Sequence, residues 1–478
     1  MSIKNRQLSL KDVYTDCQEM FLDFEQAPTF FQLLEQHVDI AEFIPSTFYN
    51  AFYQRLGRKR DYELSGFLSS LILQKIFSIP SDSLLILLLK ICKELRDFCG
   101  FTKVPDAPLY TRFKQTFIPW IEIMFHNMVD HTEPICQAID SAMAQILTLD
   151  TTGIELYVKE NNPKTLNSLI KRLKSYFKDD PNVDPLNMAY GLMPPSAVSS
   201  PDAKQQYING HFCYADKFAM LTNGLGIVRH IVFLDDDFKD AHPELVIEKK
   251  SDSPNEDKSI SDASALKPVL SDYFKLHPRF NHNTFLGDSA FDAIEIYSAL
   301  KEDFGFDKVL IPYNPRNKST LDKVGYNIYG YPTCPKDPSV DMKYSGLCSE
   351  KGRADRHKWG CPKVRMKNGQ WINECNEPCS TAKRGRTTYT YENMEFRMFP
   401  GLQRDSDEWR DTYKIRTSVE RSINHFKTNM CVAGRKSRNH LTTKADVFIA
   451  GIASQLTAIV AFRMNNTKLI RSLKPLAA

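Results

Sequence analysis

The sequence predicts an α/β protein with an all-α N-terminal domain, and three observations lead to this fold class. Residues 1 to about 135 contain helical apolar runs and few strand signals. Beyond them, short β-type runs end in carboxylates at Asp150 and Asp288. Towards the C-terminus, the residues from Tyr413 to Lys427 have the spacing of an amphipathic helix. Together these elements predict a sheet flanked by helices.

Length and composition are those of a globular protein. With 478 residues the chain is long enough for two or three domains, and its hydrophobic content of 42% suits sizeable cores. No stretch reaches the ~18 uninterrupted apolar residues of a membrane span, and the N-terminus lacks the apolar run of a signal peptide. We therefore expect a cytoplasmic protein without a membrane partner. In a reducing compartment the eleven cysteines are considered first as metal ligands, not as a disulfide framework.

Positive charge is concentrated in one stretch of the chain. The net charge is only +4, but residues 383–438 contain 13 Lys and Arg against 7 Asp and Glu. Phosphate contacts from Lys and Arg supply most non-specific affinity for nucleic acids. This stretch therefore suits a polyanionic partner.

Residues 1–135 are predicted to form a helical N-terminal domain. Two apolar runs, 66–77 and 84–92, are separated by Pro80-Ser81-Asp82-Ser83, which is a helix-start signal. Nothing in this domain carries chemistry. It is either a helical packing domain or a DNA-binding domain.

The first candidate strand runs from Gln145 to Glu155 and carries Asp150. An ionised Asp in an apolar strand is costly unless it is paired or metal-bound, although a lone Asp at a strand end is often a turn residue. Residues 156–206 are predicted to be an insertion. Strands 211–221 and 227–234 follow, joined by the hairpin signal Asn223-Gly224.

A second strand-end carboxylate, Asp288, follows the run that begins at Asn283. A helix is expected over 294–304 and a strand over 308–313. Taken by itself, Asp292 is interpreted as a helix N-cap. The acids at 235–237 are expected to be solvated.

Residues 314–405 lack a clear core pattern and contain five cysteines. Two stand in Cys-Pro steps, and two have the ligand spacing Cys375-x3-Cys379. Four thiolates suit a closed tetrahedral zinc site. The predicted zinc ligands are Cys334, Cys361, Cys375 and Cys379, with Cys348 as the spare thiol. Since no Cys-x2-Cys pair is present, buried free thiols are the alternative. Three tryptophans, Trp359, Trp371 and Trp409, are interpreted as packing residues or as platforms for an unpaired base.

The helix expected over 413–427 has two distinct sides. Its apolar residues fall on one stripe, which predicts the core-facing side: Ile415, Val419, Ile423, Phe426 and Met430. Another side groups one acid with cations and hydrogen-bonding residues: Tyr413, Arg416, Glu420, Asn424 and Lys427. Taken alone, this second side could be a solvated face with an Arg416–Glu420 pair.

Four residues of this helix reproduce the signature Tyr-x2-Arg-x3-Glu-x6-Lys at all three spacings: Tyr413, Arg416, Glu420 and Lys427. The segment thereby resembles the catalytic-Glu helix of the DDE transposases of bacterial insertion sequences. The run Leu149-Asp150-Thr151-Thr152 is similar to the first catalytic Asp of that family. The strand, Asp, helix, strand order around Asp288 is similar to the second, although Ser289 and Ala290 stand where relatives often have a basic residue and Gly.

The resemblance implies an RNase H-like catalytic core with an insertion before the catalytic-Glu helix. On this basis residues 140–313 form the first part of the core, 314–405 a Cys-rich insertion, and 406–478 the catalytic-Glu helix and C-terminal helices. For the helical domain of residues 1–135, the resemblance implies end recognition or dimerisation. Two Mg²⁺ (or Mn²⁺) ions are implied at Asp150, Asp288 and Glu420. The implied DNA-binding residues are Tyr413, Arg416, Arg421 and Lys427.

The implied partners are double-stranded DNA, as transposon ends and target, and a second copy of the chain in the DNA complex. A nucleoid-associated location follows from the same resemblance. Two alternatives stay open. One is a metal-dependent nuclease of RNase H-like fold that performs no strand transfer, and the other is a catalytically inactive DNA-binding derivative.

Overall fold

The computed structural model describes residues 30–53, 60–180, 182–208, 211–245, 260–314, 325–327, 330–391, 396–397, 401–404 and 406–476. The chain divides into two compact units. The first comprises Met1–Ile135, Thr428–Arg435 and Leu441–Ala478. The second comprises Cys136–Lys427 and Lys436–His440. The first unit therefore combines the N-terminal helices with most of the last long helix.

The first unit is built from helices. α4 is buried on nearly all sides, as expected of a central helix. α5 begins at the predicted signal, because the Ser81 side chain accepts a hydrogen bond from the Leu84 amide at 3.2 Å. The longer helices here are α2 (Phe30–His37), α3 (Ser46–Phe52), α4 (Leu64–Ile76), α5 (Asp82–Ile91), α6 (Lys93–Phe98), α7 (Ala107–Ile139) and α16 (His440–Arg463). Short 3-10 turns are η2 (Ile40–Phe43), η10 (Thr467–Leu469) and η11 (Lys474–Leu476).

A buried ion network lies inside this unit. Asp446 Oδ1 is 3.0 Å from both Lys75 Nζ and Lys114 Nζ, and 3.1 Å from Arg435. Asp82 contacts Lys114 at 3.0 Å and Arg435 at 2.5 Å. Three cations thus share two carboxylates with little access to water. Asp446 contacts all three cations and is the centre of the network.

α16 is long and apolar enough to cross a membrane, and it is the one such helix in the part of the chain that the structure describes. However, 89% of its most apolar window is buried within the protein. This burial is that of a core helix.

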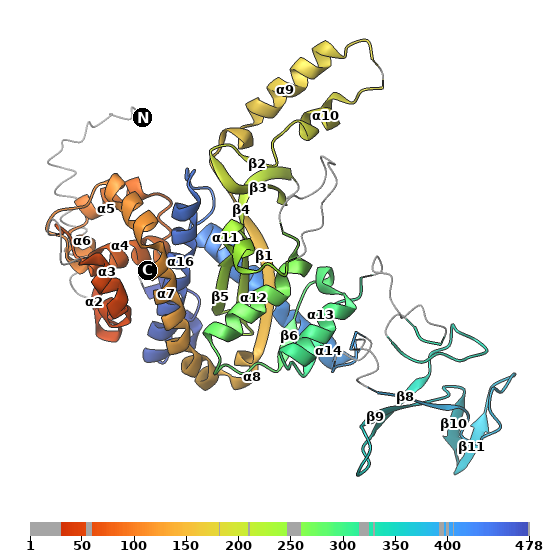
Figure 1. Cartoon of the computed structure of the whole chain (residues 1–478). Coiled ribbons are helices and arrows are strands. Elements are labelled where there is room, and N and C mark those ends of the chain that lie inside the picture. Colours follow the sequence, from red (N-terminus) through yellow and green to blue (C-terminus); the bar gives the residue numbers. More distant parts are fainter. Residues whose placement is uncertain are drawn as a thin grey trace, which may run out of the picture. The chain divides into compact units, whose positions relative to one another are not determined.

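The second unit contains a mixed sheet whose strand order is β2-β3-β4-β1-β6-β7, with β5 also paired to β4 (Figure 1). β4 runs antiparallel to β1, β3 and β5, whereas β6 is parallel to β1 and β7 is parallel to β6. The strands are β1 (Ile146–Glu155), β2 (Ser196–Ala197), β3 (Ser200–Ile208), β4 (His211–Asn223), β5 (Val228–Phe233), β6 (Thr284–Leu286) and β7 (Lys308–Leu310). A mixed α/β architecture and the hairpin at Asn223-Gly224 are both as predicted.

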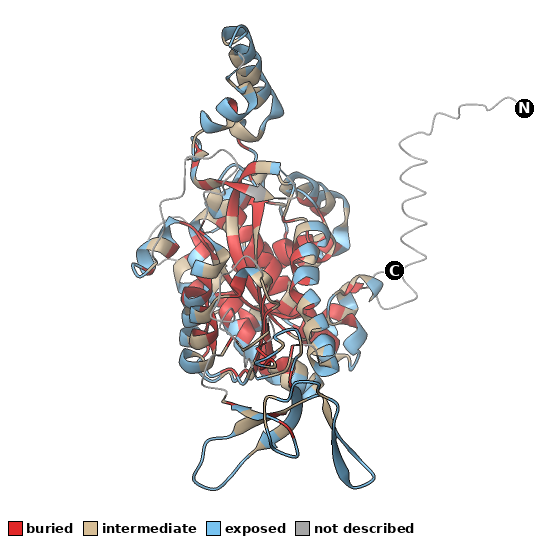
Figure 2. Ribbon diagram, turned by 90° about the vertical axis from the view of Figure 1, so that its right-hand side faces the viewer, coloured by how far each residue is buried: buried red, intermediate tan, exposed pale blue. Residues whose placement is uncertain are grey.

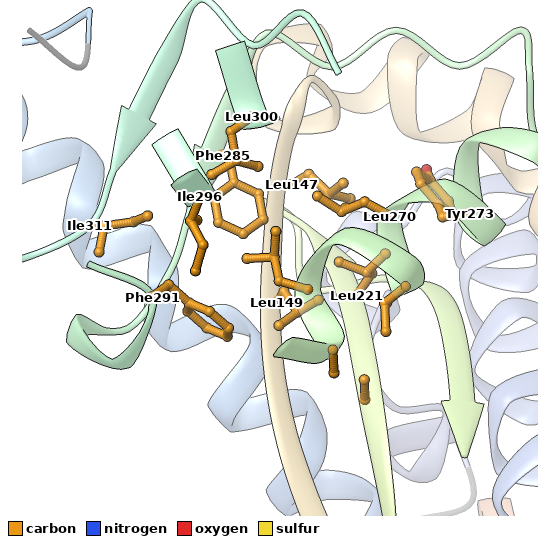
Figure 3. Close-up of a cluster of buried hydrophobic side chains, with 14 of the residues drawn as sticks. Leu147, Leu149, Leu221, Leu270, Tyr273, Phe285, Phe291, Ile296, Leu300 and Ile311 are labelled. Atoms are coloured by element: carbon orange, nitrogen blue, oxygen red, sulfur yellow. The ribbon is translucent and has the colours of Figure 1, made fainter. Parts of the chain in front are cut away.

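Each face of the sheet carries its own helices. Figure 3 shows Leu147 and Leu149 of β1 together with Leu270 and Tyr273 of α12 (Asp262–Leu276), in one cluster of buried side chains. Ile146, one residue earlier on β1, belongs to a different cluster, against which Trp409, Tyr413 and Ile415 pack. Successive strand side chains point to opposite faces. Even-numbered β1 residues therefore face the helix predicted over 413–427, called the signature helix below, and odd-numbered ones face α12.

The remaining elements of the second unit are short helices and two small sheets. The short helices and turns are α8 (Ser141–Ala144), η3 (Lys159–Asn161), α9 (Pro163–Tyr176), α10 (Pro185–Gly191), α11 (Asp236–Ala241), η4 (Ser289–Phe291), α13 (Ile294–Ser298) and the π turn η5 (Ala299–Asp303). Within the predicted insertion 314–405, one sheet has the order β12-β9-β8 and the other pairs β10 with β11. Their bounds are β8 (Lys343–Cys348), β9 (Arg356–Gly360), β10 (Val364–Lys367), β11 (Gln370–Asn373) and β12 (Thr387–Thr390).

The predicted solvation of residues 235–237 is wrong for Asp235. This residue is buried, caps α11 through the Phe238 amide, and lies 3.0 Å from His440 Nε2. The other ring nitrogen of His440 is 3.2 Å from Asp216. Burial disfavours the charged imidazolium, but the hydrogen-bonded Asp235 and the ion-paired Asp216 outweigh it and raise the pKa of His440 to about 10.

We expect this cluster to make stability depend on pH. The folded-state pKa of His440 exceeds its ordinary value of 6.5, so its stabilisation is fully present below pH 6.5 and is lost as pH rises through about 10. Over that window the free energy of unfolding should fall by up to about 5 kcal/mol more in the wild type than in His440→Gln. Urea unfolding of both proteins across this range measures the difference. A gap between them that does not change with pH contradicts the assignment.

Candidate active site

Two of the predicted carboxylates are placed by adjacent parallel strands. Asp150 lies in β1, and Asp288 follows the end of β6. The strands pair with Thr148 opposite Leu286, so Asp150 and Asp288 each stand two residues beyond the same pair. A separation of two residues keeps a side chain on the same face. Both carboxylates therefore project from the face that packs against the signature helix.

The third carboxylate, Glu420, comes from that helix, and Arg416 connects all three. One guanidinium nitrogen of Arg416 lies 3.3 Å from Asp288 Oδ2 and 3.9 Å from Asp150 Oδ2. Another lies 2.5 Å from Glu420 Oε1. The Arg416 side chain is only 12% exposed. The structure thus brings the three predicted carboxylates to one buried cation.

Electrostatics distinguish Asp150 from the other two acids. Its side chain is 24% exposed, against 49% for Asp288 and for Glu420. Burial is the main cause that raises the pKa of Asp150 to about 6, and the charges of Asp262 and Glu420 add to it. Arg416 and the Thr151 amide, which donates to Asp150 at 2.9 Å, act in the opposite direction. A bound cation would therefore favour the ionised form of Asp150.

The segment after β6 differs from the prediction for Asp292. Asp288 is the N-cap of η4, with its Oδ1 accepting from the Ala290 amide at 3.4 Å. Asp292 is no helix N-cap, because Ala293 holds that position before α13. Instead, Asp292 is fully buried and forms an ion pair with Arg397. It also accepts a hydrogen bond from the Asn314 amide at 2.7 Å.

This buried pair holds the chain around Asp288. Because the Asp292 carboxylate binds Arg397, it joins the segment after β6 to a residue in the predicted insertion. Arg404 adds a second link, donating to the Tyr297 hydroxyl at 2.7 Å. Sequence reasoning missed these supporting residues, because ion-pair partners about a hundred residues apart leave no local pattern.

The signature helix is present but is not one regular α-helix. It consists of α14 (Asp407–Tyr413), the 3-10 turn η8 (Lys414–Arg416), α15 (Thr417–Asn424) and the π turn η9 (His425–Asn429). The predicted apolar stripe is correct, since Val419, Ile423, Phe426 and Met430 are buried and Ile415 packs on the sheet. The irregular turns flank α15, which carries Glu420.

The other predicted DNA-binding residues near the carboxylates differ in how far they are buried. Tyr413 stacks on Trp409 at 4.7 Å between ring centroids, and its hydroxyl donates to the Gly287 carbonyl at 3.2 Å. Burial raises the pKa of Tyr413 to about 12, so it is a neutral phenol. Lys427 is partly buried and contacts the Thr152 hydroxyl at 2.5 Å. Burial lowers the pKa of Lys427. Arg421 is exposed.

A further acid near the site was not predicted. Asp262, at the start of α12, accepts a hydrogen bond from the Thr151 hydroxyl at 2.6 Å and lies 2.8 Å from Lys217. Thr151 is on the opposite face of β1 from Asp150. Asp262, which binds Thr151, is therefore not a fourth member of the carboxylate group. The helix-start pair Ser261-Asp262 is its one sequence signal.

One cluster of metal-ligating side chains within the described ranges has all its ligand atoms within 4.8 Å of one another. It consists of Glu155, His211 and Cys213, of which the first two are exposed. It was not predicted. The carboxylates at Arg416 are a separate set, held together by that cation.

Comparisons with known proteins give one family match and a structural match of low similarity. Residues 19–116 match the family described as "Transposase domain (DUF772)". No curated protein matches the chain. One solved structure that matches is titled "Cryo-EM structure of piggyBac transposase synaptic complex with hairpin DNA", with 10% identity, 94% of this chain and 78% of that chain covered, and a TM-score of 0.35. The family match supports a transposase, whereas similarity at this TM-score does not define the fold.

Proposed function

We propose that this chain is a DDE transposase that binds the ends of its insertion sequence, cleaves the phosphodiester backbone and joins the freed 3′-hydroxyl to target DNA. The observation that carries the proposal is the convergence of Asp150, Asp288 and Glu420 on Arg416. It occurs in a chain whose N-terminal segment matches a transposase domain.

The strand order supports an RNase H-like core. In the sheet, β5 and β1 both pair antiparallel with β4. On the other side of β1, β6 and then β7 continue the sheet as parallel strands. The carboxylates lie on β1, just after β6, and on a helix that covers the same face. We infer that double-stranded DNA lies over this face and that two copies of the chain act on the two ends.

The donor set fits Mg²⁺ or Mn²⁺, because it consists of carboxylate oxygens, which hard divalent cations prefer. Asp150, Asp288 and Glu420 would hold two such ions. When bound, the ions would stabilise the charge that develops on the attacking and leaving oxygens.

Arg416 has a specific place in this proposal. Its guanidinium contacts all three carboxylates, so it competes with any other cation for the same oxygens. A divalent cation at the carboxylates would free the guanidinium for a DNA phosphate, to which Arg can bind through two parallel hydrogen bonds. Tyr413 and Lys427 lie beside the same carboxylates, and exposed Arg421 extends the positive surface along α15.

DNA that carries the inverted repeats flanking the gene tests the function. We expect cleavage at the repeat boundaries with Mg²⁺, and joined products when target DNA is added. Cleavage without joined product favours a nuclease of the same fold. Binding of the ends without metal-dependent cleavage favours an inactive DNA-binding derivative. Absence of any binding to the flanking repeats contradicts the proposal.

The basic side of the signature helix gives a prediction of its own. Lys427→Ala should weaken binding to the ends and lower the slope of log affinity against log salt by about one unit, because one phosphate contact is lost. Arg416→Ala should have the same effect when Ca²⁺ supports binding without cleavage, and less effect in a chelator, where Arg416 is engaged by the carboxylates. Salt titrations of end binding measure both slopes.

Lys267→Ala is the matched control. Lys267 is 63% exposed on α12, on the other face of the sheet, and pairs with Asp303 at 2.7 Å. Its removal lowers the net charge equally but should leave the slope unchanged. If Arg416→Ala and Lys427→Ala change the slope no more than Lys267→Ala does, Arg416 and Lys427 belong to an ordinary charged surface.

A further inference from the structure

Four cysteines that are far apart in sequence line one small cavity. They are Cys334, Cys361, Cys375 and Cys379, and the cavity has a volume of about 20 Å³. A space of that size holds one water-sized occupant. Cys348, the fifth cysteine of this segment, lies in β8 and does not line the cavity. Four of the five thiols of this segment therefore share one cavity, and the fifth lies outside it.

Backbone hydrogen bonds hold two of the four cysteines in place. Cys334 begins a turn in which the Asp337 amide donates to the Cys334 carbonyl at 3.2 Å, and the Cys334 amide donates to the Val340 carbonyl at 2.8 Å. The Cys361 amide donates to the Arg386 carbonyl at 3.0 Å, which fixes the second Cys-Pro step to the residue before β12.

The hairpin between Cys361 and Cys375 has no core of its own. β10 and β11 are joined by Asn368-Gly369, both with positive φ, as in a two-residue hairpin turn. None of the eight strand residues is buried, and Figure 2 shows the segment as largely exposed. An isolated two-stranded hairpin is marginally stable in water. The two cysteines stand just outside its two strand ends, where a cross-link is most effective.

The neighbouring sheet adds little apolar burial. The hydrophobic cluster beside β8 and β9 contains three buried residues, Tyr331, Met342 and Trp359. Small modules with so little core usually depend on a metal or on disulfides. The hairpin and this sheet therefore need a further connection, and the four thiols stand where it would be made.

We propose that the four cysteines bind one structural Zn²⁺ as a closed tetrahedral site. Thiolates select soft or borderline metals and disfavour Mg²⁺, so the site is chemically separate from the carboxylates at Arg416. No three of these four sulfur atoms all lie within 4.8 Å of one another in the described structure, so metal binding has to draw them together. In this role the ion fixes the base of the β10–β11 hairpin to the turn at Cys334.

Metal content of the full-length chain tests the site. Elemental analysis should give about one zinc per chain, and Cys375→Ser and Cys379→Ser should each lose most of it. Cys348→Ser is the matched control, since it makes the same change at the thiol that does not line the cavity. It should keep one zinc. Equal loss of zinc in Cys348→Ser overturns the proposed ligand set.

The wild-type protein provides a test that no folding defect can obscure. Titration with a mercurial should release zinc as four thiols are blocked, and Co²⁺ in place of zinc should give the absorption of a tetrahedral four-thiolate site. A strong chelator should speed amide exchange in residues 361–379 before it affects β1 or β4. Zinc well below one per chain with all four thiols freely titratable, or a disulfide between Cys334 and Cys379, overturns the proposal. None of these readouts depends on DNA cleavage.

Discussion

Replacing Asp150 with alanine is expected to lower the rate of Mg²⁺-dependent cleavage of the cognate DNA ends by about 10³-fold or more, with end binding largely retained. Asp150 is the least exposed of the three carboxylates and is fixed on the central strand β1. Its removal would take away one of the three carboxylates proposed to hold the metal ions. Asp288→Ala and Glu420→Ala should show losses of the same order.

Two further variants make this measurement specific. Asp150→Asn keeps the shape of the side chain and removes its charge, so it should be as inactive as alanine if charge is what matters. Asp237→Ala removes an exposed acid in the same unit and should cleave normally. Gel-based cleavage and gel-shift binding, with circular dichroism to confirm folding, provide the readouts. Near-normal cleavage by any one of the three alanine variants removes that residue from the site.

Local patterns predicted the elements that carry the site. The stripe through Val419, Ile423 and Phe426 identified the signature helix, because helical spacing is visible within one window of sequence. The strands with Asp150 and Asp288 were recognisable as short β-type runs for the same reason. Their parallel pairing then placed the two acids at one end of the sheet.

Contacts between distant residues could not be predicted in this way. Arg416 was expected to bind DNA phosphates, and the structure places it among the three carboxylates. Periodicity gave the face of the helix on which Arg416 lies, but not what that face meets. Asp292 illustrates the same limit, since its buried partner Arg397 is separated from it by 105 residues. Burial and partner choice are properties of the assembled fold.

The structure of the Cys-rich segment was predictable only in part. Cys-Pro steps and the Cys375-x3-Cys379 spacing predicted which four thiols belong together, and the same four line one cavity. Of the three tryptophans in or near the segment, Trp359 is buried and donates to Thr390 at 2.8 Å, which supports packing. Trp371 is 38% exposed. The sequence alone could not separate these environments, because both residues lie in short polar strands.

The second large effect is expected in the first unit, where Asp446→Ala should lower the free energy of unfolding by about 3–5 kcal/mol. Its Oδ1 is within 3.1 Å of Lys75, Lys114 and Arg435, and its side chain is 1% exposed. Removing the acid leaves these buried cations with Asp82 as their remaining partner in the network. Their desolvation cost is then poorly compensated, which is why loss of one member of a buried ion network costs more than the network contributes as a whole.

Acid unfolding should report the same carboxylate. Burial alone raises the pKa of Asp446, but Arg435, Lys114 and Lys75 outweigh it and hold this pKa well below its usual range. Its stabilisation is thus present above the unfolded-state value near 3.8 and is lost as pH falls below it. Denaturant unfolding and hydrogen exchange of α4 and α16, measured above and below this value, should show the wild type losing more stability than Asp446→Ala.

Asp407→Ala is the control for this change, because Asp407 is 92% exposed and pairs with Arg410 on the surface of α14. Surface pairs of this kind contribute about 0–1 kcal/mol, so the control should unfold nearly as the wild type does. An Asp446→Ala protein within about 1 kcal/mol of the control would show that the three cations find other partners or water, contrary to the buried network.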